Sequence, residues 1–484
     1  MARVGGATQT QRNADGGGSL GRRGPSQLLG EYEPLVPRVH KERQVTVFGY
    51  PVRNALIIFM VGFGSVAGLA GQSISLPLYL SALENAGGPY FVLWLCGLAF
   101  TVIFGVWSAC LAIAQSGNIH PSMLRLKWHP LMLAVGLADA LNGVFIVYSS
   151  NVERVPGPTQ AVLGLTALPF TLVFSKILLR RVYNARQLLG AGFVFAGLVL
   201  IVAPQLHLAA TGDASFSSAV AWWWPLIYLL GQVPGALMNV LQEKLQFDFR
   251  LAAKAAQLAP SDREFSAIYF QFVESFYQWV FLCAFFFFDL IPNFGISHNL
   301  DDFAASFRSG WKCFMNSGDE TMTEYSDRCA YAGGLGTLFI AAYVVTYVFS
   351  TLATRHASAN LLATATSTLP AVIALLFWLL APAANTWAGG SSPSAWEIGF
   401  NVGSLALSVP GMCIYYYFTK PDPHGAATIH SIGRPPALTA TGTLNSDPDS
   451  AVGLPDSEAE DDTTASLELC CPNPRNLCCP RRLV

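Results

Sequence analysis

The chain has 484 residues, of which 52% are hydrophobic and 12% charged, and its formal net charge is −2. Soluble proteins have about 25% charged residues, so this composition excludes a soluble fold of this size, whose surface would need more charge. Without a basic excess, nucleic acid is also excluded as the expected partner. We interpret the chain as an integral membrane protein whose surroundings are the lipid bilayer.

The two ends of the chain differ from the rest. Residues 1–53 and 420–484 are rich in Gly, Ser, Pro and Thr and poor in apolar residues, which is typical of disordered segments. We therefore expect two disordered cytosolic tails on either side of one membrane domain, residues 54–419.

Ten apolar segments in this domain are long enough to span a bilayer, which takes about 20 residues per helix. Because an unpaired backbone cannot cross lipid, they predict an all-α bundle of ten transmembrane helices. The segments are Asn54–Leu83, Tyr90–Gln115, His129–Ser149, Gly157–Leu179, Leu188–Pro204, Ala219–Leu241, Ser266–Asp289, Gly333–Thr354, Ala357–Ala381 and Trp396–Thr419.

The charges of the loops predict the orientation. If the N-terminus is cytosolic, fifteen Lys and Arg lie on the cytosolic side and four on the other, namely Arg154, Arg308, Lys312 and Arg328. Cytosolic loops carry the excess of positive residues. We therefore expect both termini in the cytosol and a long lumenal loop, residues 290–332, between spans seven and eight.

The fourth and ninth spans resemble each other. Gln160–Leu179 and Asn360–Leu379 each begin with a polar residue, continue through small and hydroxyl residues, and reach a Leu-Pro pair. Pro169 and Pro370 are thus predicted helix breaks at matching places in two halves, 54–204 and 219–419. Each half has five spans, so the halves must be inverted, which is typical of secondary transporters that bind substrate between the halves. The alternative is coincidence, because Pro is common in membrane helices.

The sequence has no motif for enzyme chemistry. It contains neither a GxxxxGK[ST] nucleotide loop nor an HExxH metal site, and its eight His residues are scattered. We therefore expect no enzymatic activity, no cofactor and no resident metal.

Two blocks, Gly136–Ala191 and Ser350–Ala371, carry a resemblance to a known family. In the order and spacing of their residues they resemble the chloroquine-resistance-transporter-like family of the drug/metabolite transporter superfamily. The long lumenal loop is similar too. The residues that carry the resemblance are Asp139, Gln160, Pro169, the run Leu179–Tyr183, Leu189, Gly190, Gly310–Cys313 and Cys329.

This resemblance implies ten spans in two inverted five-helix halves, a central cavity and alternating access. Known members move cationic drugs, amino acids, peptides or glutathione-type thiols across vacuolar, lysosomal or plastid membranes, in some cases driven by the proton gradient. The chain departs from some members in span eight, where the uncharged run Tyr343–Val348 stands in place of an acidic residue.

Ionisable residues inside spans are costly and point to function. Asp139, in the middle of span three, is expected to bind a proton and release it in the cytosol, or to pair with a substrate ammonium group. The alternative is a structural carboxylate held by Asn142 or by a neighbouring hydroxyl group. Glu274 in span seven shares a helix face with Gln271 and Gln278, and this polar stripe is expected to face the cavity or a neighbouring helix.

Other polar residues are weaker candidates for the substrate and proton pathway. Glu243 matches an acidic family position at the cytosolic end of span six, with pairing to Lys244 as the alternative. Lys176 is expected to reach the membrane interface with its ammonium group. Uncharged candidates for the cavity wall, for which capping is the alternative at Gln160 and Asn360, are Gln72, Gln160, Gln232, Asn360, Thr166, Ser367 and Thr368.

The cysteines suggest two modifications. Cys313 and Cys329 share the lumenal loop, and an oxidising lumen would join them in a disulfide. Near the C-terminus, two Cys-Cys pairs lie beside basic residues, which favours S-palmitoylation of the tail over a zinc site. These four residues are Cys470, Cys471, Cys478 and Cys479.

Together these features predict a secondary active transporter that moves small organic solutes from an organelle lumen to the cytosol, with protons as the driving ion. The segment Glu31–Val36 is close to an acidic-dihydrophobic sorting pattern, which favours a vacuolar or lysosomal membrane, with the plastid envelope as the alternative. Two other functions stay open. A nucleotide-sugar or phosphorylated-metabolite exchanger would need Lys or Arg for phosphate, and a membrane scaffold would need no transport pathway.

Overall fold

The computed structural model describes residues 46–47, 50–83, 86–114, 119–211, 222–258, 263, 265–317, 327–356, 359–390 and 395–418. Within these ranges the side chains of several helical stretches, including residues 351–356 and 359–367, are not described. Residues 1–45 of the expected N-terminal tail, the expected C-terminal tail and the four C-terminal cysteines lie outside the described residues. The end of the expected N-terminal tail, residues 46–47 and 50–53, is ordered as two short strands and the start of the first helix.

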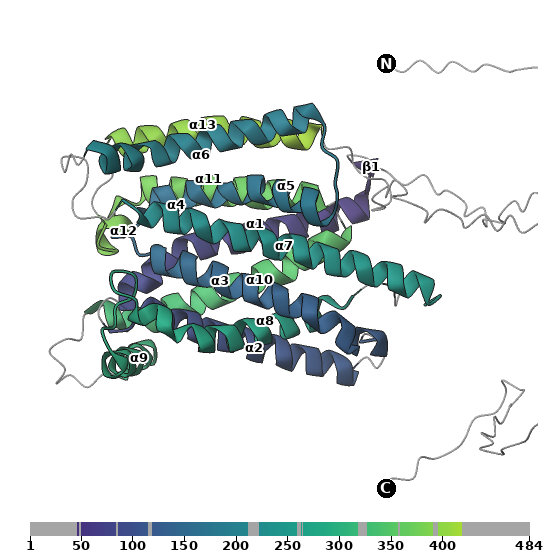
Figure 1. The fold of residues 1–484 in the computed structure, drawn as a ribbon, viewed down its shortest axis with the longest axis horizontal. Helices are drawn as coiled ribbons and strands as arrows, with labels where there is room; N and C mark the ends of the chain where they lie inside the picture. The colour runs from purple at the N-terminus through teal and green to yellow at the C-terminus, as the bar shows by residue number, and fades with distance from the viewer. Residues whose placement is uncertain are drawn as a thin grey trace, which may run out of the picture. The chain divides into compact units, whose positions relative to one another are not determined.

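Every predicted span corresponds to helix in the structure (Figure 1). The long helices are α1 (Val52–Leu83), α2 (Pro89–Ala114), α3 (His129–Ser149), α6 (Ala185–Thr211), α7 (Trp224–Ala255), α8 (Ala267–Ala284), α10 (Ala332–His356), α11 (Ala359–Leu380) and α13 (Ala395–Tyr417). Shorter elements are α4 (Gly157–Leu163), α5 (Ala167–Leu178), α9 (Leu300–Phe314) and α12 (Pro382–Trp387). Short 3₁₀ helices are η1 (Pro121–Leu124), η2 (Leu126–Trp128), η3 (Gly164–Thr166), η6 (Phe285–Leu290) and η7 (Asp327–Tyr331). Two strands, β1 (Thr46–Val47) and β2 (Tyr50–Pro51), pair antiparallel.

Among the described residues, nine segments are long and apolar enough to cross a membrane. The tenth predicted span is α11, which has 22 residues and of which Thr368–Leu380 qualifies as a shorter apolar helix. The chain is therefore an all-α integral membrane protein.

The two prolines that were predicted to break helices behave differently. Span four is divided into α4, η3 and α5, with the 3₁₀ turn ending at Thr166, three residues before Pro169. Proline lacks the N–H that would bond to the carbonyl four residues earlier, which lies within this turn. By contrast, α11 remains helical through Pro370, so the expected break is not seen there. Membrane helices tolerate proline where neighbouring groups satisfy the freed carbonyl.

The contacts between helices repeat across the two halves. The first span of each half packs against the third span of the other, which gives the pairs α1–α10 and α7–α3. The fourth spans and the first spans also pack crosswise, as α11–α1 and α5–α7. Equivalent spans also pack directly, as α2–α8, α6–α13 and α4–α11, whereas the extensive α3–α8 contact has only a slight counterpart in α10–α2. Apart from the α3–α8 contact, this pattern agrees with two halves of five spans each.

The C-terminal ends of α1, α3, α6, α8 and α11 lie at one end of the bundle, together with α9 and α12 (Figure 1). We call this the α9 end, and it is the end expected to face the lumen. The strands β1 and β2 lie at the opposite end, toward which α7 extends beyond its neighbours (Figure 1). There Trp128, Leu245 and Phe249 are buried in a separate apolar cluster.

Candidate functional site

Two carboxyl groups are buried where α3 meets α8. Asp139 on α3 and Glu274 on α8 are each 1% exposed. The close approach of the helices depends on Gly136, one turn before Asp139, because a Cβ atom at this position would lie 3.1 Å from the carbonyl oxygen of Glu274 and 3.0 Å from the backbone nitrogen of Gln278. The two carboxyl groups are near enough to interact electrostatically.

Asp139 is bonded from the other half of the protein. The hydroxyl group of Tyr347 on α10 donates to Asp139 Oδ2 at 3.0 Å. The other carboxyl oxygen, Oδ1, is buried and has no hydrogen-bond partner among the described residues. Of the two alternative partners expected from the sequence, the hydroxyl group is thus present, whereas Asn142 donates its amide to the Gly231 carbonyl of α7 at 2.8 Å.

Glu274 is surrounded by side-chain amides. Gln242 on α7 donates to both carboxyl oxygens, at 2.8 and 3.0 Å, and Gln271 donates to Oε2 at 3.0 Å. Gln271 and Gln278 are buried, so the predicted polar stripe faces protein and not lipid. The amide oxygens of both glutamines are buried without a hydrogen-bond donor among the described residues.

Neither carboxyl group forms a salt bridge with any residue that the structure describes. Aromatic rings enclose Asp139 on the α2 and α10 side, where Phe100 stacks on Tyr343 at 4.6 Å and Phe104 meets Tyr347 edge-on at 6.0 Å. A buried carboxyl group that has no salt bridge is stabilised by binding a proton or a cationic group. This set of residues can therefore hold a proton or an ammonium group.

Gln72 and Gln160, expected along a cavity, make contacts of other kinds. Gln72 on α1 donates to Thr346 Oγ1 of α10 at 2.7 Å, and so joins the two halves. Gln160 donates to the carbonyl oxygens of Ser150 and Val155 at 2.8 and 2.7 Å, and so holds the turn before α4.

The remaining uncharged candidates are spread along the bundle. Thr166 bonds within its own helix to the Leu163 carbonyl, and Gln232 is half-buried on α7. Thr368 on α11 contacts Met412 Sδ on α13 at 2.9 Å. Asn360 lies on α11 and Ser367 seven residues later, but their side chains lie outside the described part of the chain.

Glu243 and Lys176 lie away from the buried carboxyl groups. Glu243 forms a salt bridge with Arg181, in the turn between α5 and α6, and both side chains are 30% exposed. Lys244, the partner expected from the sequence, pairs with Asp248 at 2.9 Å. Lys176 is exposed on α5, as an ammonium group that reaches toward the interface requires.

Sequence reasoning missed Tyr347, Tyr343 and Gln242. A tyrosine in an apolar segment gives no signal of its own, and Tyr347 is 208 residues from Asp139 in the sequence. Gln242 was detectable in principle, because an uncharged amide near the end of a span is as costly to bury as the amides of Gln271 and Gln278.

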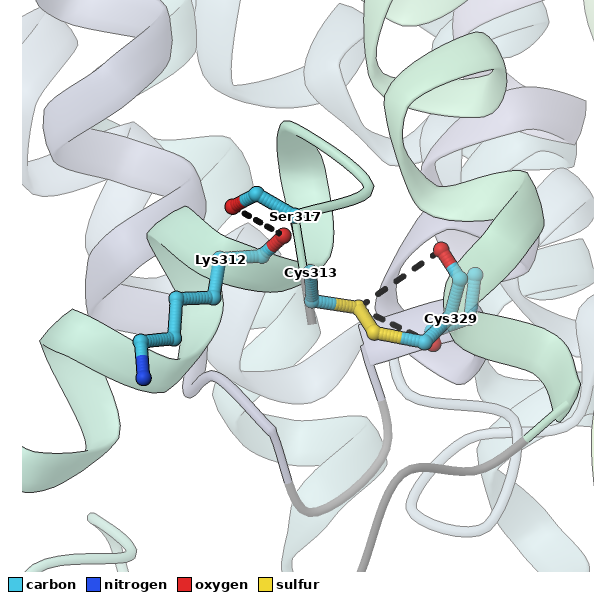
Figure 2. The surroundings of a disulfide bond; sticks show 5 residues. Lys312, Cys313, Ser317 and Cys329 are labelled. Atoms are coloured by element: carbon cyan, nitrogen blue, oxygen red, sulfur yellow. Dashed lines mark hydrogen bonds between the residues drawn. A yellow bond between two sulfur atoms is a disulfide. The ribbon is translucent and has the colours of Figure 1, made fainter. Parts of the chain in front are cut away.

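The loop cysteines form the expected disulfide (Figure 2). It joins Cys313, at the end of α9, to Cys329 in η7, with their Cα atoms 5.2 Å apart, a usual separation for a disulfide. In Figure 2 the hydroxyl group of Ser317 points to the Lys312 carbonyl oxygen, 3.4 Å away, where the chain turns after α9. The disulfide therefore fastens α9 to the start of α10.

No group of three or more His, Cys, Asp or Glu that could hold a metal ion occurs among the described residues. The buried carboxyl groups are accompanied by amides and phenols. These residues are suited to binding a proton or a cationic solute.

Comparison with known proteins gives a consistent result. Residues 66–386 match the family described as CRT-like, chloroquine-resistance transporter-like. Over 109 residues the chain is 34% identical to Crt homolog 3 of Dictyostelium discoideum, a segment that covers 22% of this chain and only 21% of that relative. Protein CLT3, chloroplastic, of Arabidopsis thaliana is 24% identical over 386 residues, which cover 79% of this chain and 76% of the relative. The chloroquine resistance transporter of Toxoplasma gondii is 28% identical over 110 residues, covering 22% of this chain and 12% of the relative.

Proposed function

The chain belongs to the CRT-like, chloroquine-resistance transporter-like family, and from this membership we propose that it is a proton-coupled secondary transporter of small organic solutes. The proposed solutes are amino acids, peptides, thiols such as glutathione, and cationic drugs. The proposed direction is from an organelle lumen to the cytosol, by alternating access between the two inverted halves.

The observation that carries this proposal is the pair Asp139 and Glu274. Both carboxyl groups are buried, both lack a salt bridge to any described residue, and Asp139 is bonded across the two halves by Tyr347. Burying an unpaired carboxylate in a membrane protein is costly, so a purely structural pair would be expected to carry a partner cation. A carboxyl group that binds a proton loses its charge, and with it this cost. Proton binding therefore explains why the pair is buried without a cation.

The contacts between the halves support alternating access. Polar contacts join a first span to a third span in both interfaces. Gln72 donates to Thr346 and to the Ala342 carbonyl oxygen between α1 and α10, and Asn142 donates to the Gly231 carbonyl oxygen between α3 and α7. Because both interfaces join the same kinds of span, we expect a rotation of the halves about the site to change both sets of contacts.

The first alternative, an exchanger of phosphorylated metabolites, is less well supported. Such a carrier needs Lys or Arg to hold phosphate, and Lys176 points outward from α5. The second alternative, a scaffold without transport, gives no reason for two buried carboxyl groups without cations. We also propose that the α9 end faces the lumen of a vacuole, lysosome or plastid, that both termini are cytosolic, and that the C-terminal tail is held at the membrane by palmitoylation.

The experiment that tests the proposal is uptake into proteoliposomes across an imposed pH gradient. The probes are radiolabelled amino acids, a dipeptide, glutathione and a cationic drug, and the controls are protein-free liposomes and vesicles whose gradient is collapsed with a proton ionophore. Uptake of at least one probe that requires both the protein and the gradient is the expected result. Exchange of phosphorylated sugars with no uptake of these probes would instead support the first alternative.

A further inference from the structure

Two phenol groups extend the Asp139 site along α10. Tyr343 and Tyr347 are one helical turn apart, and their hydroxyl oxygens are 3.3 Å from each other. Tyr347 is in turn 3.0 Å from Asp139 Oδ2. The rings of Phe100 and Phe104 pack against these two phenol rings, and both tyrosines are half-buried.

The hydrogen bonds among Tyr343, Tyr347 and Asp139 can be donated in either of two directions. The hydroxyl group of Tyr347 has a single proton and can donate it to Asp139 or to Tyr343, but not to both. If Asp139 is ionised, Tyr347 donates to the carboxylate and accepts from Tyr343. If Asp139 is protonated, its O–H donates to Tyr347, which then donates to Tyr343. Loss of one proton therefore reverses both bonds.

We propose that Tyr347, supported by Tyr343, is a positioning residue that ties the protonation of Asp139 to the contact between the two halves. This inference rests on the proposed proton-coupled function. The bond to an ionised carboxylate is charge-assisted and about twice as strong as a neutral one. Loss of the proton therefore tightens the contact between α3 and α10, and uptake of a proton loosens it.

The position of Tyr347 on α10 extends this effect to a second interface. The preceding residue, Thr346, accepts the bond from Gln72 of α1. Adjacent residues of α10 thus bind spans three and one of the other half. A shift of α10 that follows the protonation of Asp139 acts on both contacts.

The surroundings of the hydroxyl chain contain few other titratable groups. Among the described residues, Glu274 of α8 and Cys96 of α2 interact electrostatically with it, and α7 contributes the uncharged amide of Gln242 through Glu274. Glu274 is therefore the group to control for in any test of pH dependence.

The test is an infrared titration of the purified protein in lipid nanodiscs, which requires no transported solute. The carbonyl band of protonated Asp139 is identified by its loss in Asp139→Asn, and each tyrosine variant is also measured with Glu274→Gln. Tyr347→Phe keeps the ring and removes the hydroxyl group, and Tyr343→Phe removes the outer bond. The matched control is Tyr79→Phe, because Tyr79 is a fully buried phenol without a hydrogen-bond partner among the described residues.

We expect Tyr347→Phe to move the midpoint of the Asp139 band to higher pH by about one unit, because the ionised form loses a donor. Tyr343→Phe should move it less in the same direction, and Tyr79→Phe should not move it. An unchanged midpoint in Tyr347→Phe overturns the inference, and if that variant does not fold, an unchanged midpoint in Tyr343→Phe overturns it. If no band that depends on Asp139 titrates in the wild type, the proposed proton site itself is wrong.

Discussion

The guanidinium group of Arg154 lies 4.0 Å from the centre of the Trp224 ring, at the α9 end of the bundle. Arg154 belongs to the turn between α3 and α4, and Trp224 begins α7, so this contact joins the two halves. The same guanidinium donates through Nη1 to the carbonyl oxygens of Tyr148 and Phe294, at 2.7 and 3.2 Å. Burial lowers the pKa of the Arg154 guanidinium group. Nearby Tyr148 and Asp289 raise this pKa and so offset part of the effect.

Removing this contact should weaken the α9 end. Arg154→Gln loses a cation–π contact and two charge-assisted bonds, so we expect about 2 kcal/mol of destabilisation. The measurement is thermal unfolding of the purified protein in detergent. Arg308→Gln is the matched control, because Arg308 is an exposed arginine on α9 at the same end. Equal melting temperatures for the two variants would contradict this account.

Two glycines of α1 give a sharp test of helix packing. A Cβ atom at Gly68 would lie 2.4 Å from Thr346 Oγ1 and 2.8 Å from the Ala342 carbonyl oxygen of α10, whereas a Cβ atom at Gly62 would meet nothing within 4 Å. We expect Gly68→Ala to destabilise the protein by about 1–3 kcal/mol. Gly62→Ala should be neutral or slightly stabilising, since Ala is the better helix former.

The assay for this pair is the melting temperature together with crosslinking between single cysteines on α1 and α10. If Gly62→Ala proves as damaging as Gly68→Ala, the α1–α10 contact is not as close as described.

The disulfide should stabilise the attachment of α9 to the bundle. Its cysteines are 16 residues apart, and closing a loop of this length is worth about 3 kcal/mol in the chain-entropy description. We expect a reductant to lower the melting temperature of the wild type. The double variant Cys313→Ser, Cys329→Ser should melt lower from the outset and should not respond to the reductant. An equal response of both proteins would mean that other cysteines are responsible.

The pairing of Glu243 with Arg181 predicts that these two residues act together. Both side chains are 30% exposed, and exposed salt bridges contribute less than about 1 kcal/mol. A double-mutant cycle with Arg181→Gln and Glu243→Gln should therefore give a small coupling energy and similar uptake in both single variants. If uptake fails in Glu243→Gln alone, Glu243 itself belongs to the transport pathway.

Hydropathy was sufficient to predict the spans, because crossing a bilayer sets both their length and their apolar character. It failed where a helix continues past its apolar stretch or is amphipathic. The span predicted to end at Leu241 continues to Ala255 as α7, since charged residues such as Lys244 and Asp248 lower the hydropathy without ending the helix. The amphipathic helix α9 lies inside the predicted loop 290–332, because its charged face lowers the mean hydropathy of the segment.

The site was predictable only in part. The cost of burying charge was enough to select Asp139 and Glu274, and i+3 and i+4 spacing placed Gln271 and Gln278 beside Glu274. The partners Tyr347 and Gln242 lie on other helices, and no local pattern indicates which helices meet. For the same reason Gln160 was expected along a cavity, whereas its amide satisfies two carbonyl groups of the preceding turn.

The most direct test of the central claim compares Asp139→Asn with the wild type in the uptake assay under an imposed pH gradient. Asp248→Asn is the control, because it removes an acidic residue that pairs with the half-buried Lys244, away from the buried carboxyl groups. All three proteins are first shown to have similar melting temperatures. The account predicts gradient-driven uptake in the wild type and in Asp248→Asn, and its loss in Asp139→Asn. Equal gradient-driven uptake in all three would contradict it, and would leave Asp139 with a structural role.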